Sequence, residues 1–318
     1  MPSAFPNFST TSSNKPVASA NFPYPATSPN LLAAFIKINP GDTIESQATA
    51  TSQAFYVIRG SGSSTWVGAG DGASGEREEI AWATGDLFVV PASETAVRHS
   101  AEADAALYWV SDEPLLQHLG VRPSVRRFSA THFTRERMLA EVERISHEPG
   151  AEHRNRMGIL LGNAVTEKNT KTLTHTLWSL LNMLPPNDAQ RPHRHNSVAL
   201  DLCVSAAPEG VYTNMGPELG EDGWVKNPIR MNWRTGGVFS TPPGWWHSHH
   251  NETDTPAWVL PMQDAGLLTH MRTLDIRFAT APPAATANGA GGAAGGADGG
   301  IRFNASSGNL PIVKGESP

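Results

Sequence analysis

Short apolar runs separated by glycine and proline turns recur along most of the chain, which is typical of many short β-strands. The pattern is strongest between about residues 30 and 115 and returns from Thr172 onward. It predicts strands at residues 55–58, 80–82, 87–90 and 107–110 in the first half and at 177–183, 198–204, 238–241 and 257–262 in the second. Strands this short and this turn-rich favour a sandwich or a small barrel in each half.

A helical pattern separates the two strand-rich halves. Met138, Val142 and Ile145 follow one another at intervals of four and three, which predicts an amphipathic helix over residues 134–147 with Thr134 as its N-cap. We therefore predict an all-β chain of five parts: an N-terminal arm (1–30), a first barrel (31–120), a helical connector (121–170), a second barrel (171–280) and a Gly/Ala-rich linker and tail (281–318).

Composition narrows the range of partners. The 318 residues carry a net charge of −6 and no basic block, which argues against nucleic acid or an anionic membrane surface as partner. No apolar run approaches the length of about 18 residues that a membrane helix needs. The single cysteine, Cys203, excludes a disulfide framework and a thiolate zinc cluster. The first thirty residues lack the basic start and apolar core of a signal peptide, so we expect a cytoplasmic protein.

Histidines are concentrated at two places in the second half. His193 and His195 are two residues apart, so in a strand they project side by side on one face, and two neutral imidazoles so placed can bind a metal ion. Taken alone, such a pair is more often a surface feature or a hydrogen-bonded pair. The second place is residues 236–251, where a proline–glycine corner delivers His247 to the start of a strand.

Around His247 the chain resembles the cupin superfamily. The second cupin motif, G(x)5PxG(x)2H(x)3N, is matched at Gly236, Pro242, Gly244, His247 and Asn251. The first motif is matched at the two earlier histidines, with Asn187 in place of its first glycine. The resemblance implies two double-stranded β-helix (cupin) barrels in one chain, with a metal bound by the set His193, His195 and His247.

One departure from the cupin pattern bears on the chemistry. The fourth cupin ligand is commonly a glutamate separated from the second histidine by three or four residues, and here Ala199 and Leu200 occupy those positions. Asp201 follows on the face of His195, but a straight strand would carry it roughly 20 Å away, so we do not expect it to be a ligand. A metal ion bound by three neutral histidines keeps open coordination positions for a chelating anion and dioxygen. Fe(II) is the preferred metal, and zinc, manganese or nickel would suit the same ligands.

The first half resembles a cupin that has lost its ligands. In the alignment that we favour, Gln47, Thr49 and Gln53 stand at the His, His and Glu positions of the first motif, and Ala96 at that of the third histidine. His99 lies nearby, out of step with the motif. We expect a structural role for this barrel, in completing the body of the protein and in subunit contacts.

Within the cupins, the chain resembles the ring-cleaving dioxygenases of the gentisate dioxygenase type. The resemblance rests on Gln-Arg-Pro-His-Arg-His at 190–195, on residues 241–251 and on Asp-Ala-Gly-Leu at 264–267. It implies Fe(II)-dependent, extradiol-type opening of a gentisate- or salicylate-like aromatic acid by dioxygen, with the acid's carboxylate and hydroxyl on the metal. It also implies a homodimer or homotetramer. A non-oxidative metal enzyme (isomerase, lyase or decarboxylase) and a small-molecule-binding bicupin are the alternatives.

Several further residues are candidates for this site, each with a structural alternative such as a salt bridge or a core position. A carboxylate-binding arginine, a second imidazole near the metal and an orienting acid are the catalytic candidates; two aromatic walls, a second arginine and an amide are the pocket candidates. These are Arg191, His249 and Asp264 for catalysis, and Arg194, Trp245, Trp246 and Gln263 for the pocket. An insertion over residues 212–233 is expected to form a lid or a subunit contact.

Overall fold

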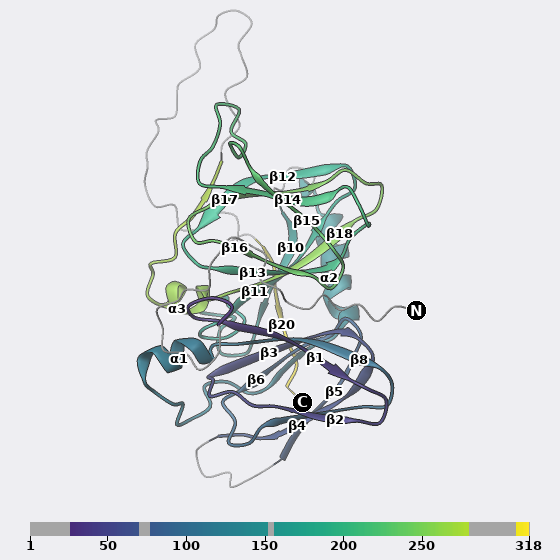
Figure 1. The fold of residues 1–318 in the computed structure, drawn as a ribbon, viewed down its shortest axis with the longest axis vertical. Coiled ribbons are helices and arrows are strands. Elements are labelled where there is room, and N and C mark those ends of the chain that lie inside the picture. Colours follow the sequence, from purple (N-terminus) through teal and green to yellow (C-terminus); the bar gives the residue numbers. More distant parts are fainter. Residues whose placement is uncertain (1–25, 70–76, 152–155, 280–309, 318) are drawn as a thin grey trace, which may run out of the picture.

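The computed structural model describes residues 26–69, 77–151, 156–279 and 310–317. It has the all-β fold expected from the sequence, with four sheets arranged as two double-stranded β-helix barrels, one above the other in Figure 1. The Gly/Ala-rich linker and nearly all of the N-terminal arm lie outside the described residues.

The first barrel consists of two facing sheets that enclose one apolar core. The five-stranded sheet has the order β1(Leu32–Ile38), β8(Ala105–Ser111), β3(Ser52–Arg59), β6(Leu87–Pro91) and β9(Thr131–Phe133). The four-stranded sheet has the order β2(Thr43–Ser46), β7(Val97–Ala101), β4(Ser61–Val67) and β5(Arg77–Ala83). Phe55 and Phe88 of the first sheet and Trp66 of the second lie in the same buried cluster, so large side chains fill this barrel.

The second barrel repeats this arrangement. Its six-stranded sheet has the order β16(Val238–Thr241), β13(Ala199–Ser205), β18(Ala257–Gln263), β11(Trp178–Leu184), β10(Met157–Gly162) and β20(Ile312–Lys314). Its five-stranded sheet has the order β15(Ile229–Asn232), β14(Val211–Gly216), β17(Trp246–Asn251), β12(Asp188–His195) and β19(Ile276–Phe278). The strand predicted at 238–241 coincides with β16, and the other predicted strands overlap observed ones.

An apolar layer joins the two barrels back to back. Tyr108 of β8 and Leu181, Leu200 and Leu202 of the second barrel belong to one buried cluster that reaches across the interface. A cluster shared in this way removes the backs of both sheets from water, which is the main favourable term holding the barrels together. The two short helices α1(Glu113–Leu119) and α3(Ala265–His270) lie at the ends of strands β8 and β18.

The connector contains both the predicted helix and strands. Helix α2(Arg135–Ser146) buries Met138, Val142 and Ile145, and the hydroxyl of Thr134 caps it by accepting a hydrogen bond from the backbone N–H of Arg137. On either side of the helix, β9 joins a sheet of the first barrel and β10 joins a sheet of the second. The connector therefore extends both barrels in addition to linking them.

The C-terminal segment spans the two barrels. Strand β20 pairs in parallel with β10, and two residues later the backbone of Glu316 bridges to His132 in β9. The carboxylate of Glu316 also forms an ion pair with Arg137 at 3.0 Å. At the start of the segment, Leu310 packs beside Trp178. The end of the chain thus docks on the body of the protein.

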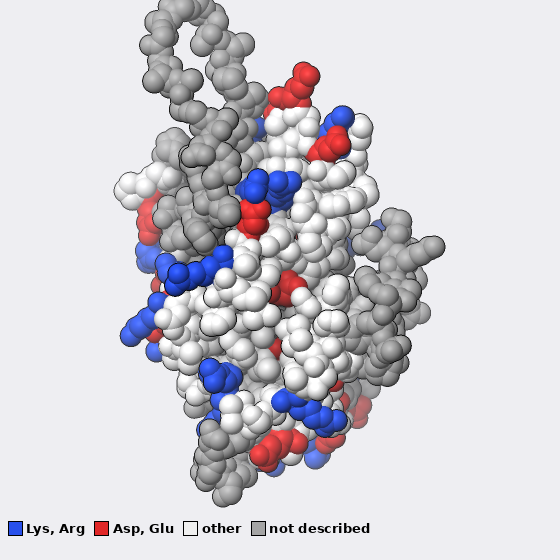
Figure 2. All heavy atoms as spheres, turned by 90° about the vertical axis from the view of Figure 1, so that its left-hand side faces the viewer, with Lys and Arg blue, Asp and Glu red and all other residues white. Residues whose placement is uncertain are grey.

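Charged residues are dispersed over the surface. Figure 2 shows acidic and basic side chains scattered across a largely uncharged face, with both signs side by side, in keeping with the net charge of −6. Among the described residues, no helix has the length and apolar character required to cross a bilayer.

Candidate metal centre

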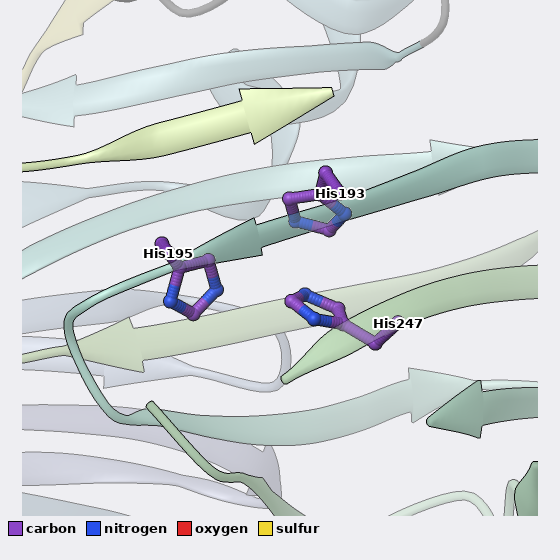
Figure 3. Close-up of side chains that lie close together, drawn as sticks. All are labelled: His193, His195 and His247. Carbon is purple, nitrogen blue, oxygen red and sulfur yellow. The ribbon is translucent and has the colours of Figure 1, made fainter. Parts of the chain in front are cut away.

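Three histidines meet inside the second barrel. His193 and His195 come from β12 and His247 from the neighbouring strand β17, and His193 is paired directly with His247 in the strand register. Their rings point toward one another (Figure 3). One ring nitrogen of each lies within 4.8 Å of those of the other two, and the side chains are only 7%, 3% and 2% exposed. In this arrangement the three side chains could hold one metal ion together.

Local backbone features explain why the motif residues bring these rings together. Asn187, which replaces the first motif glycine, has a left-handed φ of 52°, a conformation that asparagine tolerates better than most residues. Gly244 has a φ of 78° and its N–H donates to the carbonyl of His195, which ties the corner before β17 to the end of β12. At the other end of β17, the amide of Asn251 donates to the carbonyls of Leu184, Pro185 and Thr255.

Hydrogen bonds to backbone carbonyls determine the tautomer of two of the three rings. Nδ1 of His195 lies 2.8 Å from the carbonyl oxygen of Ser197, and Nδ1 of His247 lies 3.1 Å from that of Trp245. A carbonyl only accepts, so each Nδ1 carries the proton and each Nε2 keeps its lone pair for a metal.

The rings are also uncharged at neutral pH. Burial lowers the pKa of His195 to about 4 and holds those of His193 and His247 well below the usual value of 6.5. Protons therefore do not compete with a metal for the lone pairs at pH 7. Among the described residues, no carboxylate belongs to this donor group. Three imidazoles without an acid suit a first-row divalent ion, so the residues present fit the metal that the resemblance implies.

Arg156, which the sequence analysis did not single out, reaches this site from the residue before β10. One of its terminal nitrogens donates to Oε1 of Gln190 at 2.8 Å, and the other lies 2.6 Å from Nδ1 and 2.9 Å from Nε2 of His193. Burial lowers the pKa of Arg156 to about 10, so the side chain is still cationic at neutral pH. A guanidinium has donors only, so it competes with a metal for a lone pair of His193 and has to shift when that nitrogen binds an ion.

One pocket surrounds the three histidines and includes Asp201. Its other lining residues include an aromatic pair, Trp178 and Phe278, and four polar side chains, Arg156, Asn182, His249 and Gln263. The estimate of about 20 Å between Asp201 and the metal site assumed a straight strand. That assumption is wrong, because the chain bends at residues 196–198 and β13 returns in the facing sheet.

Two of the further candidates line this pocket. They are His249 and Gln263. Oε1 of Gln263 accepts a hydrogen bond from the hydroxyl of Ser197, whose carbonyl holds His195. Gln263 therefore supports His195, a candidate metal ligand, through one intervening residue.

The other five candidates lie outside the residues that line the pocket. The guanidinium of Arg191 lies 5.0 Å from the ring centroid of Trp224, and that of Arg194 lies 4.9 Å from the ring centroid of Trp246. Trp245 packs against the apolar cluster of the second barrel. Asp264 accepts hydrogen bonds from the backbone N–H of Val198 and the side chain of Asn30. The insertion packs Trp224 beside His250 and Arg191, and it too does not line the pocket.

A buried hydrogen-bonded network recurs in both barrels. In the second barrel, Nδ1 of His249 lies 2.8 Å from the hydroxyl of Thr213, which accepts from the indole N–H of Trp233 at 2.8 Å. In the first barrel, Nδ1 of His99 lies 2.7 Å from the hydroxyl of Ser64, which accepts from the indole N–H of Trp82 at 2.8 Å. His99 is thus the counterpart of His249.

This equivalence shifts the alignment of the first barrel by one residue. His247 lies two residues before His249, so its counterpart is Val97, two residues before His99, and not Ala96. The strand partner of Val97 is Ser46, as the strand partner of His247 is His193. Among the described residues, the first barrel contains no group of metal-binding side chains.

The buried His99 predicts acid sensitivity of the first barrel. Burial lowers its pKa from 6.5 to about 3, so between these two pH values the unfolded chain binds a proton that the folded chain does not. The free energy of unfolding therefore falls as the pH is lowered through this window, by about 1.4 kcal/mol per pH unit from this histidine. The measurement is the free energy of unfolding in urea between pH 7 and 5. For His99→Gln it should fall less steeply with decreasing pH than for the wild type. Equal slopes for the two proteins would contradict this account.

Sequence comparisons with known proteins give a partial match. No family model matches the chain. Among curated proteins, a gentisate 1,2-dioxygenase from a Streptomyces species is 36% identical over 87 residues, which is 27% of this chain. The match spans only about a fifth of that relative's length (21%).

Solved structures match over most of the chain. A salicylate 1,2-dioxygenase from Pseudaminobacter salicylatoxidans superposes with a TM-score of 0.59 over 80% of this chain and 76% of that one, at 14% identity. A variant of a salicylate 1,2-dioxygenase from Pseudoaminobacter salicylatoxidans, crystallised with gentisate, gives 0.59 over 81% and 75%, also at 14% identity. At this identity the likeness concerns the fold, and it is the two-barrel cupin fold described above.

Proposed function

We propose that this two-barrel cupin protein is an Fe(II)-dependent dioxygenase that opens the ring of a hydroxylated aromatic carboxylic acid. The observation that carries the proposal is the pocket itself, where three neutral histidines without a carboxylate ligand lie beside a partly buried arginine. Such a pocket suits an anion that binds a metal ion and a guanidinium at the same time. The similarity to gentisate and salicylate dioxygenases supports the same reaction class.

The charge of the donor set favours a chelating anion. Neutral ligands leave the full charge of a divalent ion in the pocket, and an acid with adjacent carboxylate and hydroxyl oxygens can neutralise it through two bonds. When bound, the metal supplies a Lewis acid that draws the substrate's oxygens together and a redox centre that brings dioxygen to the ring. The same ligands suit other divalent ions, so Fe(II) is part of the proposal.

Arg156 is the residue that we propose for the substrate's carboxylate. It is cationic, lies partly buried and already contacts a metal ligand, so a carboxylate arriving at the metal meets its guanidinium. A bidentate contact to a carboxylate is stronger than its present contact with a neutral ring. Substrate binding would therefore draw Arg156 away from His193, while Gln190 holds its other nitrogen.

The remaining pocket residues suggest how an aromatic ring is held and how an anionic oxygen beside it receives a hydrogen bond. Trp178 and Phe278 offer flat apolar walls for an aromatic substrate. For His249, Trp233 donates to the hydroxyl of Thr213, and the hydroxyl's own proton then points to Nδ1. His249 would in that case carry its proton on Nε2 and offer an N–H donor to an anionic oxygen in the pocket.

The bond that we propose to be cleaved joins the carbons bearing the carboxylate and the hydroxyl. A monohydroxylated acid has no pair of adjacent hydroxyls, so the extradiol description does not suit such a substrate. We propose a cytoplasmic homodimer or homotetramer as the working form.

Metal analysis and oxygen uptake test the proposal. Protein purified without oxygen is analysed for metal and then assayed in an oxygen electrode with hydroxybenzoates and hydroxynaphthoates. We expect about one iron per chain, oxygen uptake with at least one acid, and a ring-opened product with new near-ultraviolet absorbance. Bound metal with turnover but no oxygen uptake would favour a non-oxidative cupin enzyme. Metal that stabilises the fold without any turnover would favour a binding protein.

A further inference from the structure

The C-terminal segment, residues 310–317, contributes a side chain to the pocket around the three histidines. Leu310, at the start of the segment, lines the pocket and is 8% exposed. It belongs to one apolar cluster with Trp178 and Leu180 of β11, and these two residues line the pocket as well. One apolar wall of the pocket is therefore built jointly by a strand of the barrel and by the end of the chain.

Backbone hydrogen bonds fasten this segment at both of its ends. Near Leu310, the N–H of Leu160 in β10 donates to the carbonyl of Pro311 at 2.8 Å, and the parallel pairing of β20 with β10 follows. At the other end, the backbones of Glu316 and His132 exchange two hydrogen bonds of 2.7 and 2.8 Å. In Figure 1 the yellow segment accordingly runs from the upper barrel to the lower one. We call residues 310–317 the C-terminal strap.

Two positions near the far end of the strap show how closely it is seated. Val313 is 4% exposed and belongs to the apolar layer that joins the barrels. Gly315 lies so close to β9 that a Cβ atom there would clash with Thr131 and would lie 2.9 Å from the carbonyl oxygen of His132. Because β20 is the last strand of its sheet and is only three residues long, it can separate from β10 without unfolding the barrel.

The position of Leu310 bears on the size of the ligand. If the carboxylate of an aromatic acid binds beside Arg156, its ring has to lie against apolar lining residues, of which Leu310 is one. A single methylene more or less in a hydrophobic pocket changes the preference between two ligands by about 10–200-fold. The side chain of Leu310 is large enough to have such an effect, and it is in place only when the strap is docked.

We propose that Leu310 is a specificity-determining residue that limits the size of the ring bound in the pocket, and that docking of the C-terminal strap is required for this limit. The inference rests on the proposed function, because it assumes that an aromatic acid binds in the pocket. It adds that the upper limit of ring size is determined by a segment at the edge of the second barrel, outside the strands that carry the three histidines.

Binding of one-ring and two-ring acids to the full-length, Fe(II)-loaded protein without oxygen tests the role of Leu310. Calorimetric titration compares 2-hydroxybenzoate with 1-hydroxy-2-naphthoate and 3-hydroxy-2-naphthoate, which place their second ring at different edges of the first. For one of the two naphthoates we expect Leu310→Ala to lower the Kd relative to that of 2-hydroxybenzoate at least about tenfold, because the shorter side chain makes room for the second ring. Leu310→Phe narrows the same space and should raise this Kd ratio.

Displacing the strap at a position outside the pocket lining tests the requirement for docking. Gly315→Val adds side-chain atoms where β9 leaves no room for them. Hydrogen exchange should then become faster at the N–H groups of Leu160 and His132, which donate to the strap. We expect this variant to lower the Kd ratio as Leu310→Ala does, although Leu310 itself is unchanged.

Two further variants complete the test. Val313→Asp places a charge in the apolar layer between the barrels and is used if Gly315→Val leaves hydrogen exchange unchanged. Lys314→Gln is the matched control, because the side chain of Lys314 is 51% exposed and forms only a 3.9 Å ion pair with Glu167. The control should keep both the hydrogen exchange and the Kd ratio of the wild type.

The possible results distinguish this inference from the proposed function. An unchanged Kd ratio in both Leu310 variants overturns the role of this side chain and leaves the proposed function intact. Faster hydrogen exchange with an unchanged ratio, or unchanged exchange in both strap variants, overturns the requirement for docking. Failure of all three acids to bind the wild type overturns the proposed function and this inference together.

Discussion

Replacing His247 with alanine is expected to strip the metal from the protein and to abolish oxygen uptake. The change removes one of three neutral ligands and leaves His193 and His195, which come from the same strand, without the third point of attachment. Loss of a residue that merely supports a ligand lowers metal affinity or activity by about 10–100-fold, so loss of the ligand itself should exceed a hundredfold. Metal content per chain and the oxygen electrode measure the two effects separately.

His250→Ala provides the matched control for this variant. His250 lies on the same strand, but its ring is stacked on Tyr212 at 4.7 Å and does not line the pocket. We expect this protein to keep both its metal and its oxygen uptake. A His247→Ala protein that retained one metal per chain would show that the three-histidine group is not the metal site.

Replacing Arg156 with alanine is expected to lower kcat/KM for the aromatic acid by about a hundredfold. Truncating one partner of a buried charged contact costs about 2–5 kcal/mol, and here the lost partner is the guanidinium beside the metal ligands. Arg156→Lys keeps the charge but not the two-pronged geometry, so its activity should lie between those of the wild type and the alanine variant. Steady-state kinetics over a range of substrate concentrations gives the values.

Metal content distinguishes a role in substrate binding from a role in holding the metal. In the structure Arg156 contacts the same ring nitrogens of His193 that a metal would use, so its removal should leave metal content unchanged or higher. Arg230→Ala removes an exposed arginine that lies 3.4 Å from the ring centroid of Tyr212 and serves as the control with unchanged kinetics. An Arg156→Ala protein with normal kcat/KM, or one that has lost its metal, would contradict the role proposed for this arginine.

The three candidate metal ligands could be predicted from the sequence because their geometry is local. His193 and His195 share a strand face by the alternation of side chains alone, and the turn at Gly244 brings His247 into register with them. The helix at Arg135–Ser146 was predictable for a similar reason, since its apolar spacing and its threonine cap lie within one short segment.

The places of Arg156 and Asp201 in the pocket could not be predicted from the sequence in the same way. Arg156 precedes a strand in the six-stranded sheet, and no motif connects it to the histidines of the facing sheet. Asp201 was noticed but misplaced, because a strand count treats the chain as straight and takes no account of the bend at 196–198. Conversely, Arg191 and Arg194 lie within the same short motif as His193 and His195. Their guanidiniums nevertheless lie over tryptophan rings and do not line the pocket.

Sequence by itself determined the strand-rich character of both halves, the connecting helix and the grouping of His193, His195 and His247, because each depends on a short-range period or on a turn of a few residues. Tertiary structure alone decided which charged groups share the pocket with the three histidines, that His99 is the counterpart of His249, and where the C-terminal strand docks. These features depend on closing each barrel from strands far apart in the chain. Closure is determined by the packing of whole sheets, which the spacing of neighbouring residues does not encode.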